Sequence, residues 1–153
     1  MADALIIRQL HADDDLAAAT HLLQRFFKEE NFVTPETTIA ANTKRLASLD
    51  VCGLFLAEHG NSAIGVATVS MEFGIEYGWS AEMGDLYIVP EWRGKGISRK
   101  LVEAVESFLL QKGARGYQVT VTSFAAEHHD LSKFYNRIGF EDEGRVLLFR
   151  KIG

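Results

Sequence analysis

The stretch VPEWRGKGISRKLVEAVESFL, residues 89 to 109, constrains the fold of this chain more than any other feature. It joins an apolar run to a helix-period pattern through a turn that holds two glycines and three cations, Arg93, Lys95 and Arg99. A helix N-terminus has free N–H groups and the positive end of the helix dipole, so cations there need a bound anion to offset them. The stretch therefore predicts a strand, a glycine turn and a helix start that together bind an anionic group.

The glycines of this turn favour a diphosphate as the anion. Gly94 and Gly96 would let the backbone approach the diphosphate closely, and the three cations would neutralise its charge. Two rival phosphate motifs do not fit the sequence. No Gly-Lys-Ser/Thr follows the spacer that a P-loop requires, and the third glycine and downstream acid of a dinucleotide fingerprint are absent.

The remaining periodicities place this turn within a succession of strands and helices. A hairpin is predicted at Gly60-Asn61, an aspartate such as Asp13 is expected to cap the first helix, and Gly113 and Gly139 are expected to end the later ones. The order β-α-α-β-β-β-α-β-α-β-β predicts an α/β fold, with a mixed sheet and helices on both faces. The expected strands are 4–10, 53–59, 63–73, 81–89, 116–123 and 145–152, and the expected helices are 11–30, 35–49, 98–112 and 128–138.

Length and charge narrow the class of protein. A chain of 153 residues, 47% of them hydrophobic, predicts a single domain over 1–153 with a substantial core. No apolar run approaches the roughly 20 residues that span a bilayer, and the start MADALIIRQL lacks a leader pattern, so a cytoplasmic protein is expected. The net charge of -5 argues against a nucleic-acid partner and suits a cationic small molecule. Cys52 has no thiol partner and is expected to be a small core residue.

Two motifs carry a resemblance to a known family. The segment LYIVPEWRGKGIS (86–98) resembles the pyrophosphate-binding motif of the GNAT acyltransferase superfamily, which reads Arg or Gln, two residues, Gly, one residue, then Gly or Ala. Ser98 departs from the last position of this pattern. The segment FYNRIGF (134–140) resembles the aromatic-Tyr-x-x-x-Gly-Phe segment near the end of GNAT domains. With the order of elements, the resemblance covers nearly the whole chain.

The resemblance implies a GNAT fold, in which a mixed central sheet opens into a V-shaped splay between strands 4 and 5. Acetyl coenzyme A (acetyl-CoA) would lie in that splay as cosubstrate. The backbone groups of Tyr87, Ile88 and Val89 would contact its pantetheine and thioester carbonyl. Its diphosphate would be framed by Arg93, Gly94, Lys95, Gly96, Ile97, Ser98 and Arg99.

The resemblance also implies direct attack of an amine on the thioester. The amine must lose a proton to a base, for which Glu82 and Asp85 are the candidates, with water or another acid as the alternative. Family members often carry a glutamate at the position of Gly84. Glu82 and Asp85 lie three positions apart and point to opposite faces of an ideal strand unless a bulge intervenes, and Glu82, on the face of Gly84, is placed first. Tyr135 lies at the family's tyrosine position and would protonate the leaving thiolate.

The acceptor residues are expected in the first two helices and in the segment before strand 4. Carboxylates beside aromatic rings suit a polycation, or they are simply solvated faces. The candidates that bind the substrate are Glu29, Glu72, Glu76, Tyr77 and Trp79. Adjacent helical residues diverge, so His128 and His129 are not expected to bind metal, and no metal is expected elsewhere.

The resemblance is strongest to small single-domain enzymes that act on aminoglycosides, which implies antibiotic resistance. The alternative enzymatic hypotheses are acetylation of a polyamine, a diamino acid or a peptide N-terminus. A hypothesis of a different class is a non-catalytic module that binds acyl-CoA as a sensor. A homodimer is possible, because such folds commonly pair through sheet edges or the C-terminal strand.

Overall fold

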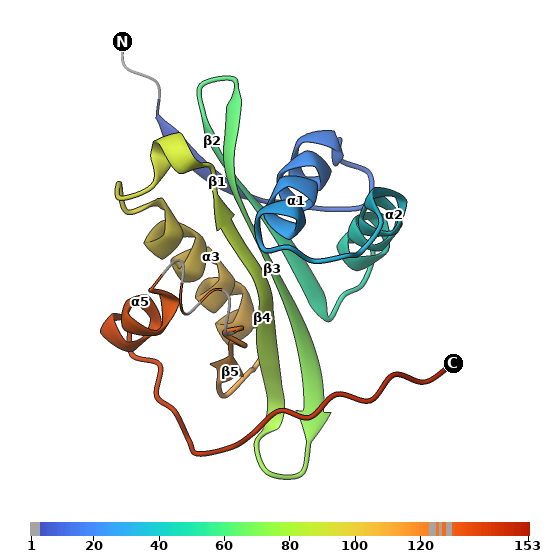
Figure 1. Cartoon of the computed structure of the whole chain (residues 1–153), viewed down its shortest axis with the longest axis vertical. Helices are drawn as coiled ribbons and strands as arrows, with labels where there is room; N and C mark the ends of the chain where they lie inside the picture. The colour runs from blue at the N-terminus through green and yellow to red at the C-terminus, as the bar shows by residue number, and fades with distance from the viewer. Residues whose placement is uncertain (1–3, 123–124, 126, 128–129) are drawn as a thin grey trace. The chain divides into compact units, whose positions relative to one another are not determined.

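The computed structural model describes residues 4–122, 125, 127 and 130–153 of the chain. The described residues fall into two compact units, unit 1 over Met1–Thr120 and unit 2 over Val121–Gly153. Unit 1 contains the sheet and three of the helices (Figure 1). Unit 2 contains helix α5 (Leu131–Arg137) and the C-terminal segment.

The sheet of unit 1 has five strands in the order β1-β2-β3-β4-β5. Neighbouring strands are antiparallel except β4 and β5, which are parallel, so the sheet is mixed as predicted. Its longest strands, β3 and β4, continue past the end of β2 as a two-stranded arm. The strands are β1 (Leu5–Leu10), β2 (Cys52–His59), β3 (Ser62–Gly74), β4 (Gly78–Ile88) and β5 (Tyr117–Gln118).

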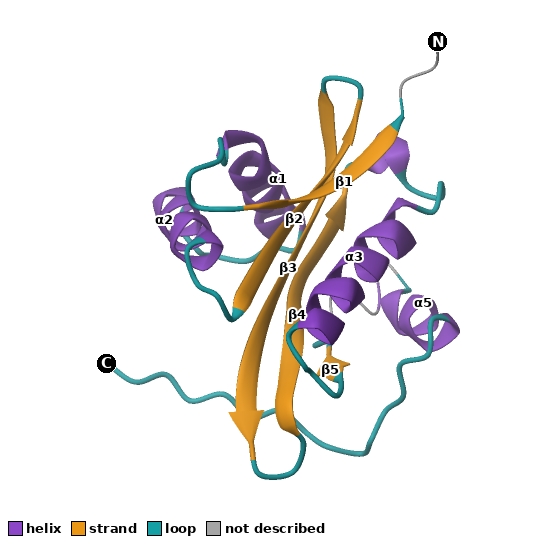
Figure 2. Ribbon diagram, turned by 180° about the vertical axis from the view of Figure 1, so that it is seen from behind, coloured by secondary structure: helices purple, strands orange, loops and turns teal. Residues whose placement is uncertain are grey.

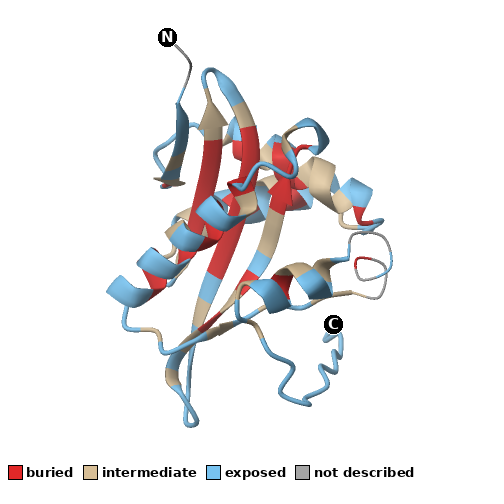
Figure 3. Cartoon of the chain, turned by 90° about the vertical axis from the view of Figure 1, so that its left-hand side faces the viewer, coloured by how far each residue is buried: buried red, intermediate tan, exposed pale blue. Residues whose placement is uncertain are grey.

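Helices cover both faces of this sheet. Helices α1 (Ala17–Glu29) and α2 (Glu36–Ala47) lie on one face, and α3 (Ile97–Gln111) lies on the other (Figures 1 and 2). The core lies between these layers, where the middles of the strands are buried and the end of the β3–β4 arm is not (Figure 3). Its largest fully buried side chains are Leu10, Leu54, Leu56, Ile64, Val66, Val69, Leu101 and Val105. The predicted α/β architecture is thus confirmed.

The predicted start of the first helix is wrong. The helix begins at Ala17 rather than near His11, and among the described residues no side chain caps it. Asp14 instead accepts a hydrogen bond from the backbone N–H of His11 (2.7 Å), and Asp15 accepts one from the N–H of Ala17 (3.0 Å). Aspartate side chains favour such local turns over helix interiors, so the acidic residues precede the helix instead of opening it.

The other turn predictions hold. Gly60, with φ of 61°, forms the turn between the antiparallel β2 and β3. Gly113 (φ 82°) and Gly139 (φ 102°) follow the ends of α3 and α5. Each takes the left-handed conformation that stops a helix without a steric cost at glycine.

The predicted strand 116–123 is mostly wrong. Only Tyr117 and Gln118 form β5, and neither is buried. Their partners in β4 are Ala81 and Glu82, and no further described residue extends this parallel pairing. A short parallel strand with two partners lacks the ladder and the burial that would hold a longer one.

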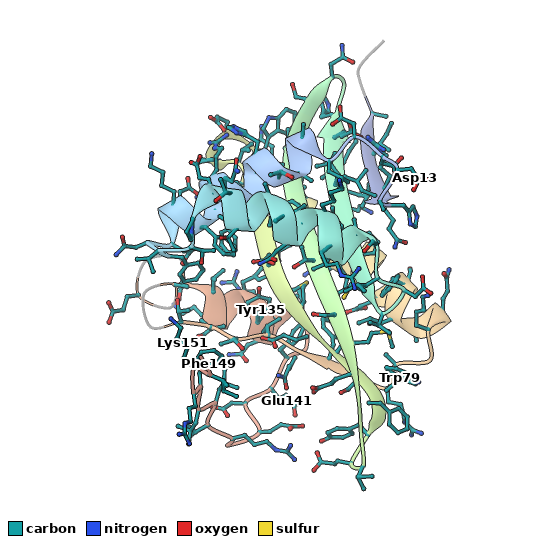
Figure 4. The ribbon with its side chains drawn as sticks, turned by 90° about the vertical axis from the view of Figure 1, so that its right-hand side faces the viewer. Asp13, Trp79, Tyr135, Glu141, Phe149 and Lys151 are labelled. Carbon is teal, nitrogen blue, oxygen red and sulfur yellow. The ribbon has the colours of Figure 1, made fainter. Side chains whose placement is uncertain are left out.

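The last predicted strand, 145–152, is also wrong. None of residues 140–153, all of which the structure describes, lies in a strand. From Val146 onward its apolar side chains are exposed, as for Phe149 (91%) and Leu148 (87%), and Figure 4 labels Phe149 and Lys151 on the coil that follows α5. An apolar run forms a strand only when a partner strand satisfies its backbone, and the described part of unit 2 contains none.

Candidate active site

A bulge in β4 decides how its two carboxylates are placed. Thr68 of β3 pairs with Asp85, and Ser70 pairs with Glu82. Two steps along β3 therefore match three along β4, which accommodates one extra residue. Because Thr68 and Ser70 share a face of β3, Glu82 and Asp85 share a face of β4. The expectation for an ideal strand, with the two carboxylates on opposite faces, is thus replaced by the bulged alternative.

Asp85 is held by a buried neighbour on the adjacent strand. The hydroxyl of Thr68, a residue only 4% exposed, donates a hydrogen bond to Oδ2 of Asp85 (2.5 Å). Burial raises the pKa of the Asp85 carboxyl; the Thr68 hydrogen bond lowers it, and the charge of Glu82 raises it further. The net pKa lies above that of an ordinary aspartate. This direction brings a carboxylate closer to the range in which it accepts a proton effectively.

Glu82 lies in a different setting on the same face. Its Oε1 accepts a hydrogen bond from the hydroxyl of Thr120 (2.9 Å), two residues past the end of β5. Glu82 is also at the last point where β4 pairs with β5. It therefore stands at the sheet edge, where the two strands separate.

The separation of β4 from β5 leaves one edge of β4 open. From Met83 to Ile88 the strand has β3 on one side, and no described strand pairs with it on the other. This is the splay that the sequence predicts between strands 4 and 5. Part of the predicted backbone surface is already engaged, because the N–H of Val89 donates to Ile64 O (2.9 Å) and Ile88 O accepts from Nε of Arg93 (2.9 Å).

The loop after β4 has the geometry that its glycines predict. Residues Pro90–Trp92 form the short 3-10 helix η1, and Gly94 (φ 76°) and Gly96 (φ 80°) both adopt the left-handed conformation. An added Cβ at either glycine would meet no described atom within 4 Å, so the backbone angle and not space requires glycine. Gly96 directly precedes α3, and no side chain of the described residues caps this helix start.

The start of α3 therefore remains suited to an anion. The N–H groups of its first turn lack a side-chain acceptor, and that turn holds cations and no acid. Arg99 is exposed there, and the ammonium of Lys95 lies 4.8 Å from the centroid of the Trp92 ring. Positive charge and free donors thus converge on one short loop.

Arg93 faces inward from this loop. Its Nη2 lies 3.3 Å from Oε2 of Glu29 at the end of α1, and its guanidinium carbon lies 5.5 Å from the centroid of the Tyr87 ring. The Tyr87 ring in turn contacts Phe26 (5.6 Å between centroids). Burial, together with the nearby Glu29 carboxylate, raises the pKa of Tyr87 to about 12. The structure thus joins Glu29, predicted to bind the acceptor, to Arg93, predicted to bind the diphosphate.

The other predicted acceptor residues lie on the β3–β4 arm. Glu72 belongs to β3, Trp79 to β4, and Glu76 and Tyr77 to the turn between them. The rings of Trp79 and Phe73 meet edge to face at 5.3 Å, and Figure 4 labels Trp79 toward the end of the arm. The arm and the glycine loop are at opposite ends of the eleven residues of β4, about 30 Å apart at the usual rise per strand residue.

Tyr135 belongs to unit 2. It lies on α5, is 9% exposed, and its ring packs edge to face with Phe134 (5.2 Å) and Phe140 (5.3 Å). Burial raises the pKa of its hydroxyl to about 12, so the phenol keeps its proton at neutral pH. A protonated phenol is the state that a general acid requires.

One feature that the sequence reading missed is a cavity on the α1 and α2 face of the sheet, beside Asp85. The one sequence feature that could have indicated this cavity is Thr68, a polar residue within the apolar run of β3. The cavity has a volume of about 100 Å³ and is partly open to solvent. Its lining comprises Leu23, Phe27, Thr34, Ile39, Asn42, Thr43, Leu46, Leu54, Thr68 and Asp85.

Clusters of metal-ligating side chains and membrane-spanning helices are both absent from the described part of the chain. Among those residues, no group of three or more His, Cys, Asp or Glu side chains is placed to hold a metal ion. His128 and His129 lie outside the described residues. In the same part of the chain, no helix is long and apolar enough to cross a membrane.

Comparison with known proteins identifies the family. Residues 50–142, more than half of the chain, match the acetyltransferase (GNAT) domain family. The chain therefore belongs to the GNAT acetyltransferases, and the prediction of an acetyl-CoA-dependent N-acetyltransferase is confirmed.

The individual relatives have low sequence identity to this chain. The aminoglycoside N(6')-acetyltransferase type 1 of Salmonella typhimurium is 24% identical over 121 residues, which cover 76% of this chain and 81% of the relative. The solved structure of the aminoglycoside N-acetyltransferase AAC(6')-Iy in complex with CoA matches with a TM-score of 0.83 and 22% identity, over 99% of this chain and 97% of that one. The integron cassette protein HFX_CASS3, from a salt-marsh metagenome, has a TM-score of 0.79 and 26% identity over 96% and 90% of the two chains.

Proposed function

We propose that this enzyme transfers the acetyl group of acetyl-CoA to a primary amine of an aminoglycoside, by direct attack within a ternary complex. The observation that carries the proposal is the bulged β4. It presents two carboxylates on one face, opens an edge beside β5, and leads into the glycine loop. A donor site and a proton acceptor are thus positioned by a single strand.

The coenzyme would bind along the open edge of β4 and the start of α3. Its diphosphate would take the free N–H groups after Gly96 and the charges of Lys95 and Arg99, with Arg93 supporting the loop through Glu29. Backbone groups near Tyr87 and Ile88 would meet the pantetheine, and a backbone N–H there would stabilise the negative charge that develops on the thioester oxygen.

Asp85 is the base that we propose. Its raised pKa, its fixed carboxylate and its place beside a cavity suit removal of a proton from the acceptor ammonium. Glu82, on the same face, is the alternative and adds negative charge that favours a cationic acceptor. The neutral amine then attacks the acetyl carbon, an N–C bond forms, the C–S bond breaks, and the thiolate takes a proton from Tyr135. The nitrogen loses its second proton as the amide forms, and this proton restores the Tyr135 phenol.

The aminoglycoside as acceptor has two supports. The Salmonella typhimurium relative carries that activity in its name, at 24% identity over most of both chains. The β3–β4 arm carries the carboxylates of Glu72 and Glu76 and the rings of Tyr77 and Trp79, groups that suit a polycation with apolar ring faces. Such a reaction would remove a positive charge from the drug and confer resistance.

The test is to incubate the full chain with acetyl-CoA and a panel of aminoglycosides, polyamines, diamino acids and short peptides. Free thiol release and product mass are followed together. An aminoglycoside heavier by one acetyl group supports the proposal. Acetylation confined to another class of acceptor would replace the substrate, and coenzyme binding without transfer to any acceptor would favour the sensor reading.

A further inference from the structure

Most of the surface that lines the cavity beside Asp85 is hydrocarbon. Helix α1, helix α2 and the strands β2, β3 and β4 all contribute to it, so it belongs to unit 1 alone. Its volume of about 100 Å³ is smaller than the roughly 300–1,000 Å³ of sites for drug-sized ligands and suits a single short hydrocarbon chain. Its apolar walls are Leu23, Phe27, Ile39, Leu46 and Leu54.

Besides Asp85, the lining has four polar residues, Thr34, Asn42, Thr43 and Thr68, and the hydroxyls of the last two are bonded within the protein. The Thr43 hydroxyl donates to Ile39 O (2.7 Å), and the Thr68 hydroxyl donates to Asp85. Of the described residues that line the cavity, only Asp85 carries a charge. A hydroxylated sugar ring would lose its hydrogen bonds to water against such walls, whereas a hydrocarbon chain would gain from leaving water.

From this arrangement we infer that the enzyme also accepts hydrophobic primary amines, with the ammonium at Asp85 and an alkyl or arylalkyl chain in the cavity. This inference rests on the proposed transferase function and adds a second class of acceptor to it. The two classes use different surfaces. The polycation is held by the exposed carboxylates of the arm, and the hydrophobic amine is held by the walls between α1, α2 and the sheet.

The transfer itself is the same for both classes. Asp85 takes a proton from the ammonium, the nitrogen forms a bond to the acetyl carbon, and the C–S bond breaks. The nitrogen loses its second proton as the amide forms, which balances the proton that the thiolate gains. The product is an N-alkyl acetamide that has lost its charge. Because its ammonium no longer pairs with Asp85, the product is released more readily than the substrate.

The experiment uses the full chain, acetyl-CoA and a series of straight-chain amines, from ethylamine through butylamine to hexylamine, with 2-phenylethylamine as the aryl member. The value of kcat/KM is expected to rise about fourfold for each methylene until the cavity is full. The increase should come mainly from KM, because the walls contact the chain and not the reacting atoms. Thermal unfolding in the presence of coenzyme A reports binding of the same amines independently of turnover.

A pair of variants locates the effect. Thr34→Phe fills part of the cavity from its half-exposed wall and is expected to remove most of the dependence on chain length. Thr38→Phe makes the same exchange at an exposed position of α2 outside the lining and is expected to keep the wild-type series. The same dependence of kcat/KM on chain length in the two variants would overturn the inference.

The outcomes separate this inference from the proposed function. If kcat/KM does not change with chain length and no amine gives a thermal shift, while an aminoglycoside is acetylated, the inference is overturned and the proposed function is supported. A thermal shift that grows with chain length and vanishes in Thr34→Phe, without acetylation of any amine, supports the ligand class and overturns the function. If no acceptor is acetylated and no amine gives a thermal shift, the inference and the proposed function are both overturned.

Discussion

The middle of β4 and its N-terminal arm are built from one continuous strand, yet they differ in every property that matters for a site. In the middle, Asp85 is fixed by the buried Thr68 and borders a cavity. In the arm, Phe73 is 68% exposed and Trp79 38% exposed, and the two rings pack edge to face. Proton transfer needs a fixed group of tuned pKa, whereas recognition of a flexible polycation needs reachable charge and ring faces. The difference indicates that chemistry belongs to the middle and recognition to the arm.

The largest effect is expected from Asp85→Asn. The amide keeps the shape of the side chain and its contact with Thr68 but cannot take a proton, so kcat/KM should fall by about 10²- to 10⁴-fold. Binding of coenzyme A, measured by calorimetry, should be unchanged. The matched variant is Glu82→Gln on the same face, for which a smaller loss is expected. A reversal of the two losses would assign the base to Glu82.

The next effect concerns the hydrogen bond between Thr68 and Asp85. This bond lowers the pKa of the carboxyl, so its removal in Thr68→Val raises that pKa further. A base must be ionised to act, and the acidic limb of the kcat/KM profile should therefore move to higher pH. Near neutral pH the variant should therefore lose activity, and the loss should diminish as the pH rises.

The control for that profile is Thr68→Ser, which restores the donor without the methyl group. It should return the acidic limb toward its wild-type position. A profile that does not move in Thr68→Val would mean that a group other than Asp85 sets the limb. Proton transfer could then no longer be assigned to the middle of β4.

The glycine loop predicts an effect on both stability and coenzyme binding. Gly96 has φ of 80°, a conformation that costs an L-residue roughly 1–2 kcal/mol. Gly96→Ala should lower Tm by about 2–8 °C and weaken coenzyme A binding several-fold. The matched variant is Gly74→Ala in β3, whose φ lies outside the left-handed region and whose added Cβ would meet no described atom within 4 Å. Equal losses in both variants would show that glycine flexibility in general, and not the helix start, matters.

The sequence predicts this loop well because its signals are local. Positive-φ glycines, a preceding proline and the helix period of α3 all act within a few residues of one another. The bulge of β4 depends instead on how two strands pair, and no local pattern reports that register. The cavity depends on five elements packing together, so its residues carry no motif. The missing C-terminal strand has the same origin, because the apolar pattern of Val146 to Phe149 is strand-like and only a pairing partner would realise it.

The smallest effect is expected at the arm, and it tests the comparison most directly. Replacing Trp79 by alanine removes an exposed ring and its edge-to-face contact with Phe73, which is worth about 0.5–1.5 kcal/mol. If the arm only recognises the acceptor, KM for an aminoglycoside should rise a few-fold while kcat stays constant. For hexylamine, which is held by the cavity, neither constant should change. A fall in kcat for both acceptors would instead mean that the arm supports the geometry of the middle of β4. The loss of a ring about 30 Å from the glycine loop would then have changed the position of the reacting groups through β4, the strand to which both Trp79 and Asp85 belong.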